Sequence, residues 1–158
     1  MKENDVRETP RALFDELNRE FHFTLDACAT HANALCDRYF TLGGLFVRGE
    51  QHGTPDGLQG SWAGQSVWCN PPFSEIHRWT AKAWSEASRT SGIVMLVPAN
   101  RTYATWWQED VAPHIKHPCF DVRWRAVRDK FTVDGKPILN KKGGIGSPSF
   151  SCALLIWK

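Results

Sequence analysis

Long apolar runs are absent from this sequence of 158 residues. No stretch of about 18 uninterrupted apolar residues occurs, which excludes a membrane-spanning helix. The first residues, Met1 to Asp5, lead into polar sequence without the apolar segment of a signal peptide, so we expect a cytoplasmic protein. With 42% apolar and 23% charged residues, the chain predicts one globular domain over residues 1–158.

Disulfide and metal-ligand patterns are also missing. The five cysteines occur singly and never as a C-x-x-C pair, and the six histidines show no ligand spacing. An odd, dispersed set of cysteines in a cytosolic chain argues against both a disulfide framework and a zinc site. We therefore interpret most of the cysteines as small buried apolar residues and predict no metal. The cysteines are Cys28, Cys36, Cys69, Cys119 and Cys152.

The chain has little excess charge, since its formal net charge is only +2. This value neither requires nor excludes nucleic acid, but the local distribution is more informative. From residue 121 onward the basic residues are crowded and the acids are only Asp121, Asp129 and Asp134. Such a cluster either neutralises phosphates or forms a solvated basic face. The candidate DNA-binding residues are Arg123, Arg125, Arg128, Lys141 and Lys142.

The eight tryptophans suggest base stacking, but most of them lie in segments that predict core. Trp68, Trp79 and Trp157 are expected in the core. Trp124 lies between two arginines, and this combination of an aromatic surface with positive charge suits nucleic acid. The alternative for Trp124 is that it covers a sheet edge.

Helical and strand-like segments alternate through the first two thirds of the chain. Thr9 and Pro10 open a predicted helix, with Thr9 as its N-cap. A short strand is expected to end near Asp26. Residues 67–69 and 93–97 predict buried strands, and the second is central because it is apolar without alternation.

The rest of the chain adds a loop and further strands. Seven glycines lie between Gly43 and Gly64, which predicts one long loop. Residues 150–157 predict a strand in the interior of the sheet. The whole pattern predicts an α/β fold with a largely parallel sheet and a hairpin at one edge.

The most informative motif is the turn Asn70-Pro71-Pro72-Phe73. It follows a buried strand and precedes a predicted helix that Ser74 caps, so it lies where ligands bind in open α/β sheets. The prolines fix their own φ angles, remove two backbone donors and extend the residues before them. The result is a stiff turn that presents two acceptors, the Asn70 side-chain oxygen and the Pro71 carbonyl.

This turn suits methyl transfer to an aromatic amino group. Two fixed acceptors hold both N–H bonds of the amine, favour a pyramidal nitrogen and stabilise the positive charge that develops on it. Phe73 offers an aromatic face to a planar substrate, and a sulfonium cofactor would carry the methyl group. The alternative is a purely structural turn, since Asn-Pro and Pro-Pro are common turn dipeptides.

The chain resembles the phage N-6-adenine-methyltransferase family, a group of compact DNA methyltransferases that use S-adenosylmethionine (AdoMet). Each short motif is weak alone, and their order and spacing carry the resemblance. These motifs are Thr9–Phe14, Phe23–Ala29, Asn33–Thr41, Asp56–Leu58, Trp62, Val67–Ser74, Trp79, Lys82–Ala83, Leu96–Ala99, Arg128, Phe131, Asp134–Lys136 and Phe150–Trp157.

The resemblance implies a Rossmann-like class I methyltransferase domain without a separate target-recognition domain. Its sheet is expected to have seven strands, mostly parallel, with an antiparallel C-terminal hairpin. The implied reaction moves a methyl group from AdoMet to adenine N6 in DNA, on a base flipped out of the helix. The implied catalytic residues are Asn70, Pro71, Pro72 and Phe73. The implied cofactor-binding residues are Thr9, Pro10, Asp26, Ala27, Cys28 and Asp56.

Two features depart from the wider methyltransferase pattern. The turn after Asp26 lacks the usual glycines, and no acid for the cofactor ribose is evident, with Asp37 as the candidate. Two other interpretations therefore remain: a methyltransferase for a protein glutamine amide or an RNA base, and a non-catalytic nucleic-acid-binding relative. Protection of DNA from restriction, in the host cytoplasm, is the role expected if a phage encodes the protein.

Overall fold

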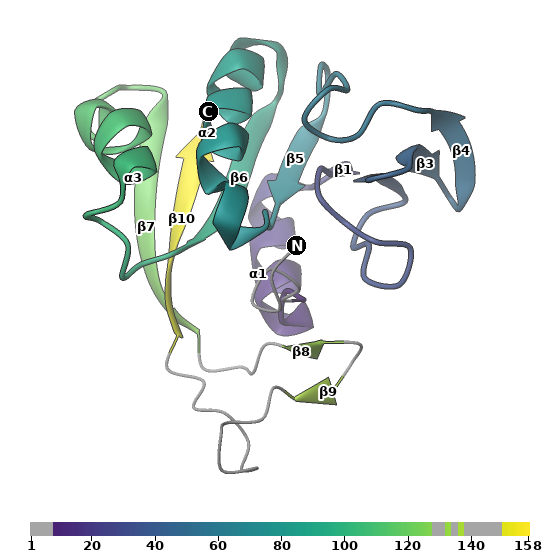
Figure 1. Ribbon diagram of the computed structural model, residues 1–158, viewed down its shortest axis with the longest axis horizontal. Coiled ribbons are helices and arrows are strands. Elements are labelled where there is room, and N and C mark those ends of the chain that lie inside the picture. Colours follow the sequence, from purple (N-terminus) through teal and green to yellow (C-terminus); the bar gives the residue numbers. More distant parts are fainter. Residues whose placement is uncertain (1–7, 128–131, 134–135, 138–149) are drawn as a thin grey trace.

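The computed structural model describes residues 8–127, 132–133, 136–137 and 150–158. Its main element is an eight-stranded sheet flanked by helices, with a separate two-stranded piece (Figure 1). The helices are α1 (Arg11–Phe21), α2 (Ile76–Glu86) and α3 (Thr105–Asp110), with 3-10 turns η2 (Phe73–Glu75), η3 (Ala87–Arg89) and η4 (Ala112–His114). The strands are β1 (Leu25–Asp26), β2 (Arg38–Thr41), β3 (Gly44–Val47), β4 (Glu50–Gly53), β5 (Ser66–Cys69), β6 (Gly92–Pro98), β7 (Phe120–Val127), β8 (Thr132–Val133), β9 (Lys136–Pro137) and β10 (Phe150–Trp157).

The main sheet has the strand order β4-β3-β2-β1-β5-β6-β10-β7. Its four middle strands, β2, β1, β5 and β6, are parallel, whereas the pairings beyond β2 and beyond β6 are antiparallel. The sheet thus has eight strands instead of the predicted seven, and it is parallel only in its middle. The predicted α/β class is confirmed. So is the antiparallel C-terminal pair, which is formed by β7 and β10.

The additional hairpin, β3 and β4, lies in the glycine-rich segment that the sequence predicts as a loop. Its two-residue turn is Arg48-Gly49, with φ angles of 51° and 84°, and positive φ at both positions suits the twist of a hairpin. Gly44 approaches the other strand so closely that a Cβ would lie 2.0 Å from the Gly53 carbonyl oxygen. The loop prediction is wrong for residues 44–53 because these glycines serve a tight turn and a close strand approach.

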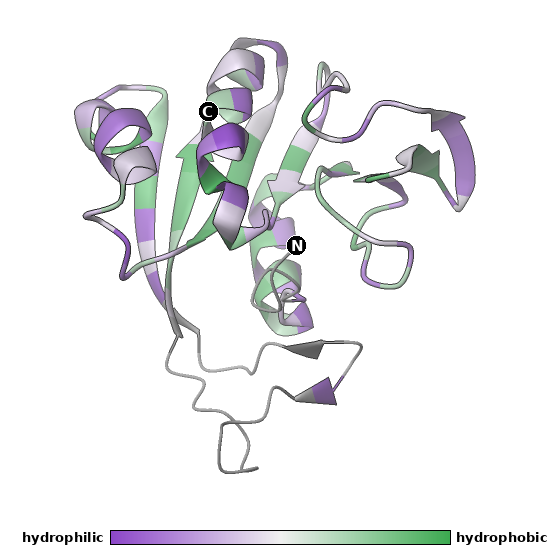
Figure 2. Cartoon of the chain, viewed as in Figure 1, coloured by the Kyte–Doolittle hydropathy of each residue, from purple (hydrophilic) through white to green (hydrophobic). Residues whose placement is uncertain are grey.

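The central strands send alternate side chains into two cores on opposite faces of the sheet. On β6, Ile93 and Met95 join the core under α2 and α3, whereas Val94 and Leu96 join the core under α1. All residues of β6 are buried, which explains its apolar run without alternation. The apolar colouring of the central strands follows this two-sided burial (Figure 2). The predicted central position of this strand is confirmed.

Three of the predicted core tryptophans are also confirmed. Trp68, Trp79 and Trp157 are all buried. Of the cysteines, Cys69 and Cys152 are buried as predicted, whereas Cys119 is exposed. Within the described part of the chain, no helix has the length and apolar character needed to cross a membrane.

The starts of α1 and α2 differ from the sequence prediction. The N-cap of α1 is Pro10 and makes no side-chain capping bond, so the predicted cap at Thr9 is wrong. The predicted cap at Ser74 is wrong as well, because Ser74 lies inside η2 and α2 begins two residues later. In both places the residue belongs to a turn whose direction is set by the adjacent prolines.

Candidate active site

A cavity of about 510 Å³ opens at the carboxyl ends of β1, β2 and β5. Its lining includes Asp26, the last residue of β1, and Asn70, which directly follows β5. The chain leaves β1 for β2 on one side and reaches β5 on the other, so the cavity lies at a topological switch point of the sheet. Its volume falls within the range of about 300–1,000 Å³ found for small-molecule sites.

The cavity brings together most of the residues that the sequence singled out. Those in its lining come from four separate parts of the chain, and they are Thr9, Asp26, Ala27, Cys28, Asp56, Asn70 and Pro72. Pro10, Pro71 and Phe73 are not in the lining. Pro71 is buried, and Phe73 is partly buried and packs against the core.

Asp26 is the buried acid of the cavity, with only 3% of its surface exposed. Its carboxylate accepts hydrogen bonds from the backbone N–H of Leu35 at 3.1 Å and of Cys28 at 3.4 Å. Burial raises the pKa of Asp26 to about 7, although these two hydrogen bonds oppose the shift. Among the described residues no cation forms an ion pair with this carboxylate. Asp26 is therefore a cavity acid whose charge has no protein counterion there.

The neighbouring thiols are not nucleophiles. Burial raises the pKa of Cys28 and also that of Cys69, and the nearby carboxylate of Asp26 adds to both shifts. Because a thiolate is the reactive form, these thiols are protonated and inert near neutral pH.

The side chain of Asn70 is hydrogen-bonded to Thr9, which lies near the N-terminal end of the described residues. Its side-chain Nδ2 donates a hydrogen bond to the Thr9 hydroxyl oxygen at 3.0 Å. The two residues are 61 positions apart, so this bond fixes the Asn70 amide across the mouth of the site. The structure thus gives Thr9 a role that differs from capping, which is to orient the side chain of the Asn70 turn.

Asp56 and Gly57 form a third wall of the cavity. The Asp56 carboxylate accepts the backbone N–H groups of Leu58 at 3.0 Å and of Gln59 at 3.1 Å, which closes a tight turn. A Cβ on Gly57 would lie 2.0 Å from the Ala27 carbonyl oxygen. Gly57 therefore lets this turn pack directly on the residue that follows β1.

The charge of the lining is negative. Among the residues that the structure describes, its acids are Glu8, Asp26, Asp56 and Glu75, and its one basic residue is Arg78. Arg78 pairs with Glu75 at 2.7 Å and does not reach Asp26. A lining of this kind favours a ligand that carries positive charge.

Several lining residues were missed from the sequence. Thr41 is the last residue of β2, and Leu42, which follows it, is 86% exposed. The strand order would have predicted them, because the strands beside a topological switch point end at the same ligand site. Asp37, the candidate for binding ribose, lies at the opposite end of β2 and pairs with Arg48 at 3.2 Å. It is not in the lining.

Two of the candidate DNA-binding residues, Arg123 and Arg125, lie elsewhere, on β7 at the edge of the sheet. Arg123 forms two hydrogen bonds of 2.8 Å with Glu20 of α1, and Arg125 pairs with Glu16 of the same helix. The hydrogen bond from Arg123 lowers the pKa of Glu20. The remaining candidates, Arg128, Lys141 and Lys142, lie outside the described residues.

Trp124 points away from these ion pairs. It is 56% exposed and packs its ring against Trp107 of α3, with a centroid distance of 5.3 Å. Its position at the edge strand agrees with both interpretations given from the sequence, since it covers an edge and leaves an aromatic surface open.

No metal centre is evident in the residues that the structure describes, which contain no group of three histidine, cysteine or acidic side chains placed to hold an ion. Comparison with known families gives one match. Residues 1–125 match the family model described as DNA N-6-adenine-methyltransferase (Dam). No curated protein matches the chain. The family match ends at residue 125, so the motifs quoted beyond that position stay predictions.

Proposed function

Because the chain belongs to the DNA N-6-adenine-methyltransferase (Dam) family, we propose that it transfers a methyl group from AdoMet to adenine N6 in DNA. The observation that carries the proposal is the cavity at the switch point, which gathers Asp26, Asn70 and Thr9 from distant parts of the chain. Family membership supplies the reaction class, and the cavity supplies a place for it. In this proposal the whole chain acts as one methyltransferase domain in the cytoplasm.

The topology supports a Rossmann-like methyltransferase fold. Four parallel strands form the middle of the sheet, and the last strand, β10, enters antiparallel between β6 and β7. Helices cover both faces, as the two cores show. Open sheets of this type place their ligands outside the carboxyl ends of the strands, which is where the cavity lies.

The cavity residues fit the proposed cofactor. AdoMet supplies a methyl group made electrophilic by its positive sulfonium, and it also carries an ammonium group. Asp26, which is buried and has no protein counterion among the described residues, would ionise beside this positive charge and offset it. Ala27, Cys28 and Asp56 would line the same binding site, and Thr9 would close it.

The Asn70 turn would hold the target amino group. The bond between Asn70 Nδ2 and the Thr9 hydroxyl holds the plane of the amide, and the amide oxygen would accept an N–H bond of adenine in that fixed orientation. The Pro71 carbonyl would accept the other N–H bond. Acceptors that are fixed before the reaction stabilise the charge that develops on nitrogen, without a cost of reorganisation. Phe73 would stack on the base.

DNA would approach from the side of this turn, with the target base flipped out of the duplex at a cost of about a few kcal/mol. Arg123 and Arg125, together with Arg128, Lys141 and Lys142, would neutralise backbone phosphates. The first two are paired with glutamates of α1, so phosphate would have to replace these partners.

The test is mass spectrometry of nucleosides from unmethylated DNA incubated with AdoMet and the purified protein. We expect N6-methyladenine with the native protein and a loss of about 10²-fold or more with Asn70→Ala. Asn33→Ala is the matched control, because Asn33 also lines the cavity but lies outside the Asn70 turn. If folded native protein that binds AdoMet gives no methylated base, the adenine proposal fails, and RNA and protein acceptors are tested next.

A further inference from the structure

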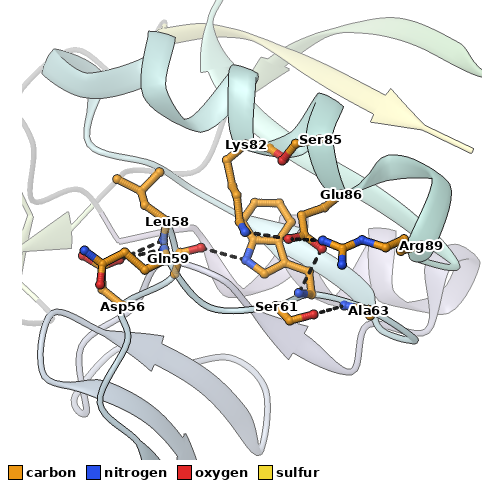
Figure 3. Close-up of polar contacts among 11 residues, drawn as sticks. Asp56, Leu58, Gln59, Ser61, Ala63, Lys82, Ser85, Glu86 and Arg89 are labelled. Carbon is orange, nitrogen blue, oxygen red and sulfur yellow. Dashed lines mark hydrogen bonds and ion pairs between the residues drawn. The ribbon is translucent and has the colours of Figure 1, made fainter.

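A charged network around the buried Glu86 lies at the end of α2 and in η3, outside the lining of the cavity. Glu86 is 1% exposed and pairs with Lys82 at 2.6 Å and with Arg89 at 2.8 Å (Figure 3). Burial opposes its ionisation, but the hydrogen bonds from Lys82 and from the Trp62 backbone leave the pKa of Glu86 below its usual value. Glu86 is therefore a carboxylate, although it lies under the protein surface. None of these three charged residues lines the cavity.

Trp62 connects this network to the cavity wall. Its backbone N–H donates to the Glu86 carboxylate at 3.2 Å, and its fully buried indole N–H donates to the Gly57 carbonyl oxygen at 2.8 Å. The Lys82 ammonium lies 5.6 Å from the centre of the indole ring. Glu86 thus holds the Trp62 backbone, Lys82 lies over its ring, and the indole of Trp62 in turn holds Gly57.

Gly57 has little freedom to move without changing the cavity. A Cβ on it would lie 2.0 Å from the Ala27 carbonyl oxygen and 3.0 Å from the Trp79 ring. Gly57, Ala27 and Trp79 all line the cavity. A shift of Gly57 would therefore move the wall made by the Asp56 turn relative to the wall that follows β1.

We propose that Trp62, oriented by Glu86, is a positioning residue for the cofactor half of the site. It holds the Asp56–Gly57 turn at the spacing that the ligand requires, through one hydrogen bond to Gly57. The inference rests on the proposed function, because it takes AdoMet as the ligand of the cavity. It assigns a role to residues that lie outside the lining of the cavity.

The chain contains a matched control for this proposal. Trp84 lies on α2, is partly buried and donates its indole N–H to the Asp110 carbonyl oxygen, also at 2.8 Å. It packs against Phe120 and Trp157, away from the cavity lining. Trp62→Phe and Trp84→Phe therefore remove the same kind of hydrogen bond from the same core, and only the first touches the cavity wall.

The experiment measures AdoMet binding by calorimetry, thermal unfolding and DNA binding for the native protein and both variants. We expect both variants to lower Tm, but only Trp62→Phe to weaken AdoMet binding, by about tenfold, the affinity equivalent of one buried hydrogen bond. The KM for AdoMet rises with it, whereas kcat at saturating AdoMet and the Kd for DNA stay within about twofold.

Equal AdoMet affinities of Trp62→Phe and Trp84→Phe would overturn the proposal. If Trp62→Phe does not fold, Glu86→Gln decides, because it keeps an acceptor for the Trp62 N–H and removes the charge that Lys82 and Arg89 pair with. We expect about threefold weaker AdoMet binding for Glu86→Gln, and native affinity would contradict the proposal. If the folded native protein does not bind AdoMet, the proposed function itself fails, and this result is distinct from a failure of the Trp62 proposal.

Discussion

The cavity at the ends of β1 and β5 and the edge strand β7 both carry polar residues that the sequence singled out. In the cavity, Asp26 is buried and accepts only backbone N–H groups, so its charge has no counterion among the described residues. On β7, Arg123 and Arg125 have their charges matched by glutamates of α1. The cavity leaves a carboxylate without a counterion among the described residues, whereas β7 has its charges matched within the protein.

This difference shows what kind of residue pattern predicts a site. A polar residue at the carboxyl end of a buried parallel strand is brought to the ligand site by the topology. A basic residue on an edge strand is placed at the surface, where its partners depend on which helix packs beside it. Exposed ion pairs are worth little, about 0–1 kcal/mol, so this pairing reduces the contribution of Arg123 to phosphate binding without abolishing it.

The largest effect should come from filling the space between the cavity walls. Gly57→Ala places a methyl group against the Ala27 carbonyl and should destabilise the protein by about 3 kcal/mol, as overpacking does. It should also weaken AdoMet binding. Urea unfolding and calorimetry measure both quantities. Gly53→Ala is the control, because its Cβ would meet only ordinary contacts at 3.6 Å and beyond, and a similar loss there would contradict the close packing of Gly57.

Asp26→Asn should separate stability from binding. The pKa of Asp26 is raised from 3.8 to about 7, so the stability that its protonated form contributes is present below about 3.8 and is lost as pH rises through about 7. Asp26→Asn should therefore be more stable than the native protein at pH 8, by about 2 kcal/mol, and this gain should vanish towards pH 4.

AdoMet binding should change in the opposite direction. Native affinity should rise with pH as Asp26 ionises, and Asp26→Asn should bind AdoMet weakly at every pH. Unfolding and calorimetry across pH 5–8 test both expectations. If the variant lost stability at pH 8, Asp26 would be a structural acid and not a residue kept for a ligand.

Thr9→Val should have a smaller effect on the Asn70 turn. It removes the acceptor of the Asn70 amide at nearly constant volume, so kcat/KM for DNA methylation should fall about fivefold, which corresponds to one hydrogen bond. Thr9→Ser keeps the hydroxyl and should retain most of the activity. If Thr9→Ser and Thr9→Val were equally impaired, the methyl group of Thr9 would matter and the hydrogen bond would not.

The smallest effects are expected on β7. Glu20→Gln frees Arg123 from its bidentate partner and should strengthen DNA binding by less than about threefold, because the pair is exposed. Glu50→Gln removes the same charge from the other end of the sheet and serves as the control. Fluorescence titrations at several salt concentrations measure both. Unchanged binding and salt dependence after Glu20→Gln would remove Arg123 from the DNA interface.

Part of the site could be predicted because it depends on local sequence. The turn after β5 was found because two prolines follow a buried strand and set the direction of the chain. The sequence also predicts that the first strand ends near Asp26, but only the family resemblance marks Asp26 as a cofactor-binding residue. The residues that were missed, such as Thr41 and Leu42, carry no local mark and line the cavity only because β2 pairs beside β1.

Two predictions from the sequence are wrong for the same reason, which is that they depend on a partner far away in the chain. The segment from Gly43 to Gly53 was predicted as a loop because glycine permits both flexible chain and tight strand contacts, and only the pairing partner decides between them. Thr9 was predicted as a cap because its best local partner is the following helix. In the folded chain its hydroxyl accepts from Asn70, which is 61 residues away.

By itself, the sequence determined the alternation of buried strands and helices, the stiff Asn70 turn and the family resemblance, because each depends on side-chain type and short spacing. Tertiary structure alone decided which charges are kept for a ligand and which are matched within the protein. It also decided that Glu86, through Trp62, supports the cavity from behind. The physical reason is that hydrogen bonds and ion pairs between distant residues form only after the sheet has set the register of its strands.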